Sequence, residues 1–180
     1  GRVIDDFIAA GQTLVNEGYA RPEALGAIGW SNGGLVVASA ALRRPELWRA
    51  VVAGAPVSDL ARFHLDDGGR HWIAEYGDPR DPRDRARLFD LSPYHMLVDD
   101  LEGPALLVIS PDRDDRVAPW HGRKLAARWR RKQVGPHPVL LRSPVDAGHR
   151  SATTAKHPYD RHAETWSFLA WQLGLPVEAG

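Results

Sequence analysis

Apolar residues form two kinds of run along this chain, short continuous ones and longer ones with helical spacing. The short runs predict buried strands, at Leu25–Trp30, Ala50–Ala55, Ala105–Ser110 and Val139–Arg142. The longer runs predict helices, at Val3–Glu17, Gly33–Arg44, His121–Lys132 and Asp160–Leu173. Because strands and helices alternate, the pattern predicts an α/β fold with a parallel sheet and helices on both of its faces.

Residues 56–104 interrupt this alternation between the second and third predicted strands. The segment is rich in charged and aromatic side chains, and it includes the polar runs Asp66–Gly69 and Asp78–Arg83. Insertions of this length between core elements are usually functional or locally helical, and we expect both here. The chain shows no internal repeat and no linker, so we expect residues 1–180 to belong to one domain.

The first predicted element is a helix that would normally follow a strand. Only about four strands are predicted, and the one at Leu25–Trp30 would present an unpaired apolar edge. We therefore expect further strands before Gly1 in a longer polypeptide, and we expect the domain to be incomplete in residues 1–180.

The balance of positive and negative charges argues against partners that are strongly anionic. The 180 residues carry 23 Lys and Arg against 23 Asp and Glu, so the formal net charge is zero. We therefore expect neither a nucleic-acid partner nor an anionic membrane. The uncharged stretch Ala24–Leu42 is long enough to cross a bilayer, but its glycines and its Ser31–Asn32 pair favour a strand, a turn and a helix instead.

The chain contains no cysteine, which excludes a disulfide scaffold, a zinc-thiolate site and a cysteine nucleophile. The sequence also lacks the H-E-x-x-H zinc motif, EF-hand spacing and the glycine-rich phosphate loops. We therefore expect no metal and no cofactor. The lack of cysteine does not fix the compartment: we expect the cytoplasm, with a periplasmic or secreted location left open.

The pentapeptide Gly29–Gly33 matches the pattern G-x-S-x-G between a predicted strand and a predicted helix. This is the context of a nucleophile turn, in which Ser31 is exposed on strained backbone beside the helix N-terminus. There the amide of Asn32 can face a developing oxyanion. The motif predicts Ser31 as the nucleophile and Asn32 as an oxyanion donor.

A serine nucleophile needs a base, and the base needs a carboxylate that orients it. In this fold class both follow the serine, on loops after later strands. The last such loop offers His149 as the base, and we expect the other histidines to be ordinary surface or hydrogen-bonded residues. Spacing leaves the acid open among Asp112, Asp114 and Asp115, with Asp146 as a weaker rival.

Three segments together resemble the prolyl oligopeptidase family of serine peptidases. They are the nucleophile segment Gly29–Leu35, the acid loop Asp114–Pro119 and the histidine loop Ala147–His149, in the family's order. The resemblance implies the later part of an α/β-hydrolase catalytic domain. It nominates Asp114 as the triad acid, and it implies that Arg116 holds a substrate carbonyl.

The same resemblance implies a proline-binding pocket and a reaction. Aromatic and apolar positions matching that pocket are Trp72, Tyr76, Val57 and Val117. The implied enzyme cleaves short peptides after proline through an acyl-enzyme. The family's preceding strands, its β-propeller and a tyrosine that gives the second oxyanion donor would lie before Gly1, and Trp30 stands where many members carry a smaller residue. A carboxylesterase, an oligopeptidase of different specificity and an inert fragment or pairing module stay as alternatives.

Overall fold

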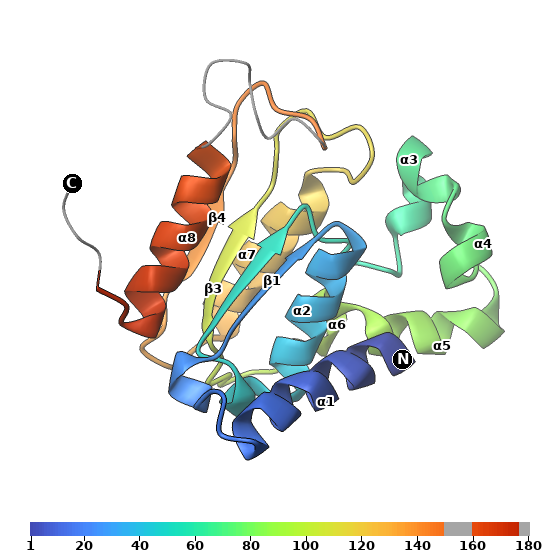
Figure 1. The fold of residues 1–180 in the computed structure, drawn as a ribbon. Helices are drawn as coiled ribbons and strands as arrows, with labels where there is room; N and C mark the ends of the chain where they lie inside the picture. The colour runs from blue at the N-terminus through green and yellow to red at the C-terminus, as the bar shows by residue number, and fades with distance from the viewer. Residues whose placement is uncertain (150–159, 177–180) are drawn as a thin grey trace.

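The computed structural model describes residues 1–149 and 160–176, and its strands form one parallel sheet in the order β1-β2-β3-β4 (Figure 1). The strands are β1 (Gly26–Trp30), β2 (Ala50–Gly54), β3 (Ala105–Ile109) and β4 (Val139–Arg142). Each lies within a predicted run, so the four strand predictions are confirmed. Register places the last residues of the strands side by side, and the segments that follow them therefore leave from one edge of the sheet.

The long helices also match their predictions, with ends shifted by at most one residue. They are α1 (Arg2–Asn16), α2 (Asn32–Arg43), α7 (Trp120–Lys132) and α8 (Asp160–Leu173). Gly18 has a φ of +76° just after α1, which is the left-handed conformation that commonly ends helices at glycine. Single 3₁₀ turns precede β1 and β2, as η1 (Pro22–Ala24) and η2 (Pro45–Leu47).

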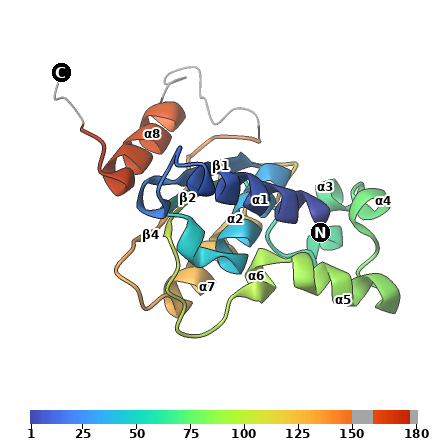
Figure 2. The same cartoon turned by 60° about the horizontal axis from the view of Figure 1, so that its bottom comes forward.

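Helices cover both faces of the sheet, as the continuous apolar strands predict (Figure 2). Val51 and Val108 point into one core with α2 and α7, and α1 packs on the outside of α2. Their neighbours Val52 and Leu107 point into a second core, where Phe168 of α8 packs. Strands buried on both faces lose the alternation of apolar and polar residues, which is why their sequences read as unbroken apolar runs.

The segment between β2 and β3 is largely helical, which confirms that part of its prediction. Its elements are η3 (Phe63–Leu65), α3 (Asp67–Arg70), α4 (Ile73–Tyr76), α5 (Pro82–Leu91) and α6 (Pro93–Met96). Helix α5 begins at Pro82, and the Asp81 side chain accepts a hydrogen bond from the Arg83 amide at 2.9 Å. Helices α3 and α4 lie beside the sheet, on the far side from α8 (Figure 1).

Strand β1 lies at an edge of the described sheet, and its Ile28 is 45% exposed. The uncharged stretch Ala24–Leu42 contains β1, the turn at Ser31 and most of α2, as predicted. In the described part of the chain, the structure has no helix with the length and apolar character that crossing a membrane requires.

Candidate active site

Ser31 lies in a strained turn between β1 and α2. Its φ of 58° and ψ of −119° are unusual for a residue with a side chain. The Ser31 amide donates a hydrogen bond to the Gly54 carbonyl at 2.8 Å, which ties the turn to the end of β2. A Cβ on Gly29 would lie 2.0 Å from the Gly33 oxygen, and one on Gly34 would lie 2.8 Å from the Gly54 oxygen. These two glycines are required because the strand and the helix approach so closely.

The structure brings Asp114 and His149 together at the same edge of the sheet. Asp114 Oδ2 lies 2.8 Å from His149 Nδ1, and both residues are buried. The other carboxylate oxygen, Oδ1, accepts hydrogen bonds from the amides of Arg116 at 3.0 Å and Val117 at 2.8 Å. In this geometry, a neutral His149 that donates from Nδ1 to an ionised Asp114 has Nε2 as its proton acceptor.

Backbone hydrogen bonds join the residues directly before the acid loop to the segment 144–147, which leads into the histidine loop. The Asp112 amide donates to the Pro144 carbonyl at 3.1 Å, and the Arg113 amide donates to the Ala147 carbonyl at 3.0 Å. The Asp112 side chain accepts a further bond from the Ala147 amide at 3.2 Å, and Asp146 forms an ion pair with Arg113. Asp112 and Asp146 therefore hold the loops together, whereas Asp114 contacts the histidine.

Trp30, the residue before Ser31, packs beside His149. Its ring lies 6.3 Å from the His149 ring, centre to centre, at an angle of 58°. A Cβ on Gly54 would lie 1.9 Å from the indole, so glycine at the end of β2 makes room for this tryptophan. Within the described part of the chain, no hydrogen bond joins the Ser31 hydroxyl to His149.

A cavity of about 930 Å³ opens beside His149, between the two loops and the helical segment. Trp72 and Arg116 line it together with His149, so three residues from separate parts of the predicted site share one space. Val57 and Val117 are 1% and 2% exposed and belong to the main hydrophobic core. They do not line this cavity, and their role in a proline pocket stays a prediction.

Tyr76 and Asn32 are joined directly. The Tyr76 hydroxyl donates a hydrogen bond to Asn32 Oδ1 at 2.7 Å. The Tyr76 ring stands edge-on to the rings of Trp72 and Phe63, with centres 6.3 Å and 5.5 Å away. One of the predicted pocket aromatics is therefore connected to the residue that follows Ser31.

A buried carboxylate anchors the helix that follows the acid loop. The Asp59 side chain has no exposed surface, and it contacts Lys124 of α7, His95 at 3.1 Å and Arg62 at 3.2 Å. Burial alone would raise the pKa of Asp59, but the hydrogen bonds and charges of Lys124 and His95 outweigh it and lower the pKa. Burial lowers the pKa of the neighbouring His121 to about 3, so this ring stays neutral and accepts a hydrogen bond from the Asp59 amide.

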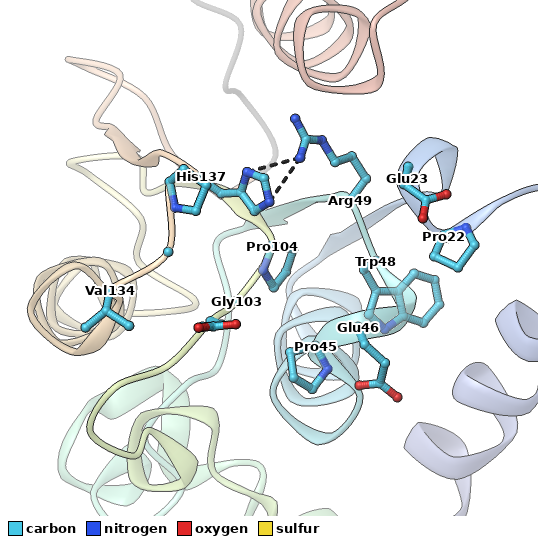
Figure 3. A pocket seen from close by; sticks show the side chains of 13 residues that line it. Pro22, Glu23, Pro45, Glu46, Trp48, Arg49, Gly103, Pro104, Val134 and His137 are labelled. Atoms are coloured by element: carbon cyan, nitrogen blue, oxygen red, sulfur yellow. Dashed lines mark hydrogen bonds between the residues drawn. The ribbon is translucent and has the colours of Figure 1, made fainter.

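A second cavity, of about 640 Å³, lies at the opposite edge of the sheet, where the strands begin (Figure 3). One guanidinium nitrogen of Arg49 contacts both ring nitrogens of His137 there, at 3.0 and 3.2 Å. None of the candidate catalytic residues lines this cavity. Across residues 1–149 and 160–176, no group of three or more histidine or carboxylate side chains is placed to hold a metal ion.

A model of the prolyl oligopeptidase family matches residues 1–176 of the chain. The chain belongs to this family. Prolyl oligopeptidase A from Galerina marginata is 39% identical over 177 residues, which cover 97% of this chain and 24% of that protein. The solved structure of a prolyl endopeptidase matches with a TM-score of 0.92 and 41% identity, over 96% of this chain and 26% of that one.

A post-proline cleaving enzyme from Rickettsia typhi matches with a TM-score of 0.90 and 32% identity, over 97% of this chain and 25% of that one. The expected family and its α/β fold are therefore confirmed. The chain spans about a quarter of the length of the prolyl oligopeptidases that it matches.

Three contacts that shape the site of this prolyl oligopeptidase family member are not predicted by its sequence. The Asp112–Ala147 bond and the Tyr76–Asn32 bond join residues that are far apart in the chain, and no sequence pattern marks them. The third contact is that of the Trp30 ring with the His149 ring, for which the missing side chain of Gly54 makes room. A glycine at the end of a buried strand was its one visible signal.

Proposed function

We propose that this member of the prolyl oligopeptidase family is a serine peptidase that hydrolyses short peptides on the carboxyl side of proline. The observation that carries the proposal is the contact of Asp114 with His149 at 2.8 Å, at the sheet edge where Ser31 occupies its strained turn. An acid, a base and a nucleophile at one sheet edge fit acyl transfer. The names of the relatives support prolyl peptides as the substrate class.

In the proposed mechanism, Ser31 Oγ attacks the scissile carbonyl carbon while His149 Nε2 accepts the hydroxyl proton. Asp114 holds the ring in the required tautomer and stabilises the imidazolium that forms. The carbonyl oxygen becomes negative and accepts a hydrogen bond from the Asn32 amide, which is the first amide of α2 and so has no acceptor within the helix. His149 then gives its proton to the leaving amine, and an ester to Ser31 remains. Water hydrolyses this ester with the same base.

Selection of proline is assigned to the cavity beside His149. A pyrrolidine ring is compact and apolar, and within a peptide it carries no amide proton, so it suits the flat indole of Trp72, which lines this cavity. Tyr76 packs edge-on against Trp72 and is proposed as the second aromatic of the pocket. The Arg116 guanidinium lies in the same cavity and has the donors to hold a main-chain carbonyl of the peptide. Short peptides are the proposed partners, and further strands and a β-propeller before Gly1 stay a prediction.

Labelling with a fluorophosphonate probe tests the nucleophile. We expect the protein at its full natural length to be modified at Ser31, because only a serine with a working base reacts rapidly with such probes. The modified peptide is identified by mass spectrometry, and Ser31→Ala should abolish the signal. A folded, full-length sample that is not labelled at Ser31 would contradict the proposed function.

Replacing Trp72 separates a prolyl peptidase from an esterase that uses the same triad. In Trp72→Ala we expect kcat/KM for a prolyl peptide to fall about 100-fold, while kcat/KM for a small acetyl ester changes little, because only the first needs the pocket wall. Trp171→Ala is the matched control, since Trp171 on α8 is 61% exposed. Thermal melting of each variant checks the fold. Equal losses for both substrates in a folded variant would favour a carboxylesterase or a different specificity.

A further inference from the structure

The hydrogen bond between Tyr76 and Asn32 connects two parts of the site that would otherwise be independent. Tyr76 lies at the end of α4, in the helical segment that carries the proline-pocket aromatics. Asn32 begins α2 and supplies the proposed oxyanion donor. The two residues are 44 positions apart in sequence, and the phenol oxygen lies 2.7 Å from Asn32 Oδ1.

Several contacts fix the position of Tyr76 itself. Its ring packs edge-on against Phe63, which is fully buried, and against Trp72. Its carbonyl accepts a hydrogen bond from Arg87 of α5. Burial, with a smaller contribution from Glu75, raises the pKa of the Tyr76 phenol, so the hydroxyl keeps its proton and remains a donor over the whole neutral range.

Asn32, in contrast, is an exposed residue at the first position of its helix. The Tyr76 hydroxyl restrains its side chain through the hydrogen bond to Oδ1. Because side chain and amide belong to one residue, holding Oδ1 limits rotation of the peptide plane that carries the proposed oxyanion donor. A donor that is already oriented contributes more to transition-state stabilisation than one that must first be ordered.

We propose that Tyr76 is a positioning residue for the oxyanion donor, so that the proline pocket is coupled to acylation through the Tyr76–Asn32 hydrogen bond. The inference rests on the proposed function. A prolyl ring that packs on Trp72 and Tyr76 would stabilise the arrangement in which Tyr76 holds Asn32. Pocket occupancy would then raise kcat for prolyl substrates as well as their affinity.

The test is Tyr76→Phe in the full-length protein, since phenylalanine keeps the aromatic wall and removes only the hydroxyl. We expect kcat for a prolyl peptide to fall about 3- to 10-fold, the effect of losing one neutral hydrogen bond, with KM changed less than about 2-fold. Tyr19→Phe is the control, because it also removes a phenol hydroxyl. Tyr19 lies in the connection between α1 and β1, and its side chain is 79% exposed. Thermal melting verifies that both variants are folded.

A double-mutant cycle with Asn32→Ala identifies the partner. Alanine removes the acceptor Oδ1 but keeps the backbone amide, so Tyr76→Phe should have no further effect on kcat in that background. Unchanged kcat in Tyr76→Phe, or effects of the two substitutions that simply multiply, would overturn the inference. Labelling of Ser31 in the wild type separates failure of this inference from failure of the proposed function. If the wild type is labelled, a negative result in the cycle overturns only the role of Tyr76. If it is not labelled, the proposed function and the inference that rests on it are both overturned.

Discussion

Replacing Asp114 by asparagine is expected to lower kcat for a prolyl peptide about 10⁴-fold, with little change in KM. The geometry of the acid loop gives the reason. Oδ1 of Asp114 accepts two backbone hydrogen bonds, from Arg116 and Val117, so the oxygen of an asparagine must take that position. Its NH₂ group would then face His149 Nδ1 and donate to it. The ring would carry its proton on Nε2, where it cannot accept the proton of Ser31.

Asp115→Asn is the matched control for this experiment. Asp115 is the next residue in the same loop; it is exposed and lines the cavity beside His149, whereas the buried Asp114 contacts the imidazole. Its substitution changes the loop charge by the same amount, and we expect kcat to stay within about 3-fold of the wild type, as for surface changes in general. Steady-state kinetics and thermal melting are measured for both variants. Comparable losses of kcat in the two would show that Asp114 is not the residue that orients His149.

Replacing Gly29 by alanine is expected to cost about 3 kcal/mol of unfolding free energy or more and to abolish labelling at Ser31. The new Cβ would lie 2.0 Å from the carbonyl oxygen of Gly33. The oxygen is a backbone atom and the Cβ is bonded directly to the backbone, so no side-chain rotation relieves the contact. Strand β1 and helix α2 would have to separate, and the turn at Ser31 would lose its conformation. Denaturant unfolding and probe labelling measure the two effects.

Gly33→Ala, within the same motif, is the control for Gly29→Ala. A Cβ on Gly33 would meet no atom within 4 Å, and alanine is favoured over glycine within a helix by up to about 1 kcal/mol. We expect this variant to be as stable as the wild type or slightly more stable. A Gly29→Ala protein as stable as Gly33→Ala would show that the close approach of strand and helix is absent in solution.

The sheet and its main helices could be predicted from sequence because burial on both faces leaves a direct trace. Residues such as Val51 and Val52 point to opposite cores, so each strand is an unbroken apolar run between polar ones. The turn at Ser31 was predicted from the pattern Gly29–Gly33, and the structure shows that the backbone of Gly33 leaves no room for a side chain at Gly29. The other crowded glycine of this turn is Gly34, which faces Gly54, whereas a Cβ on Gly33 would meet no atom within 4 Å. For the strands and for Gly29, the constraint acts along one element or between residues near in sequence.

Which aspartate contacts His149, and which hydrogen bonds join distant segments of the site, depend on contacts that sequence spacing does not encode. Asp112, Asp114 and Asp115 have the same chemistry within four residues. Which carboxylate turns inward is decided by the loop conformation, in which two amides bind Asp114. The family resemblance supplied Asp114, whereas the residues alone left the acid open. The contact of Tyr76 with Asn32 depends on how the helical segment folds back over the sheet edge.

The pairing of the acid and histidine loops has a consequence for how such a protein can diverge. The backbone bonds from the amides of residues 112 and 113, together with the bond from the Ala147 amide to the Asp112 side chain, fix the register of one loop against the other. An inserted residue in either loop would therefore separate Asp114 from His149. The helices α3, α4 and α5 lie beside the sheet, and closing a longer connection costs little additional entropy. We therefore expect related proteins that differ in substrate preference to differ in the length of this helical segment. The two paired loops should keep a constant length.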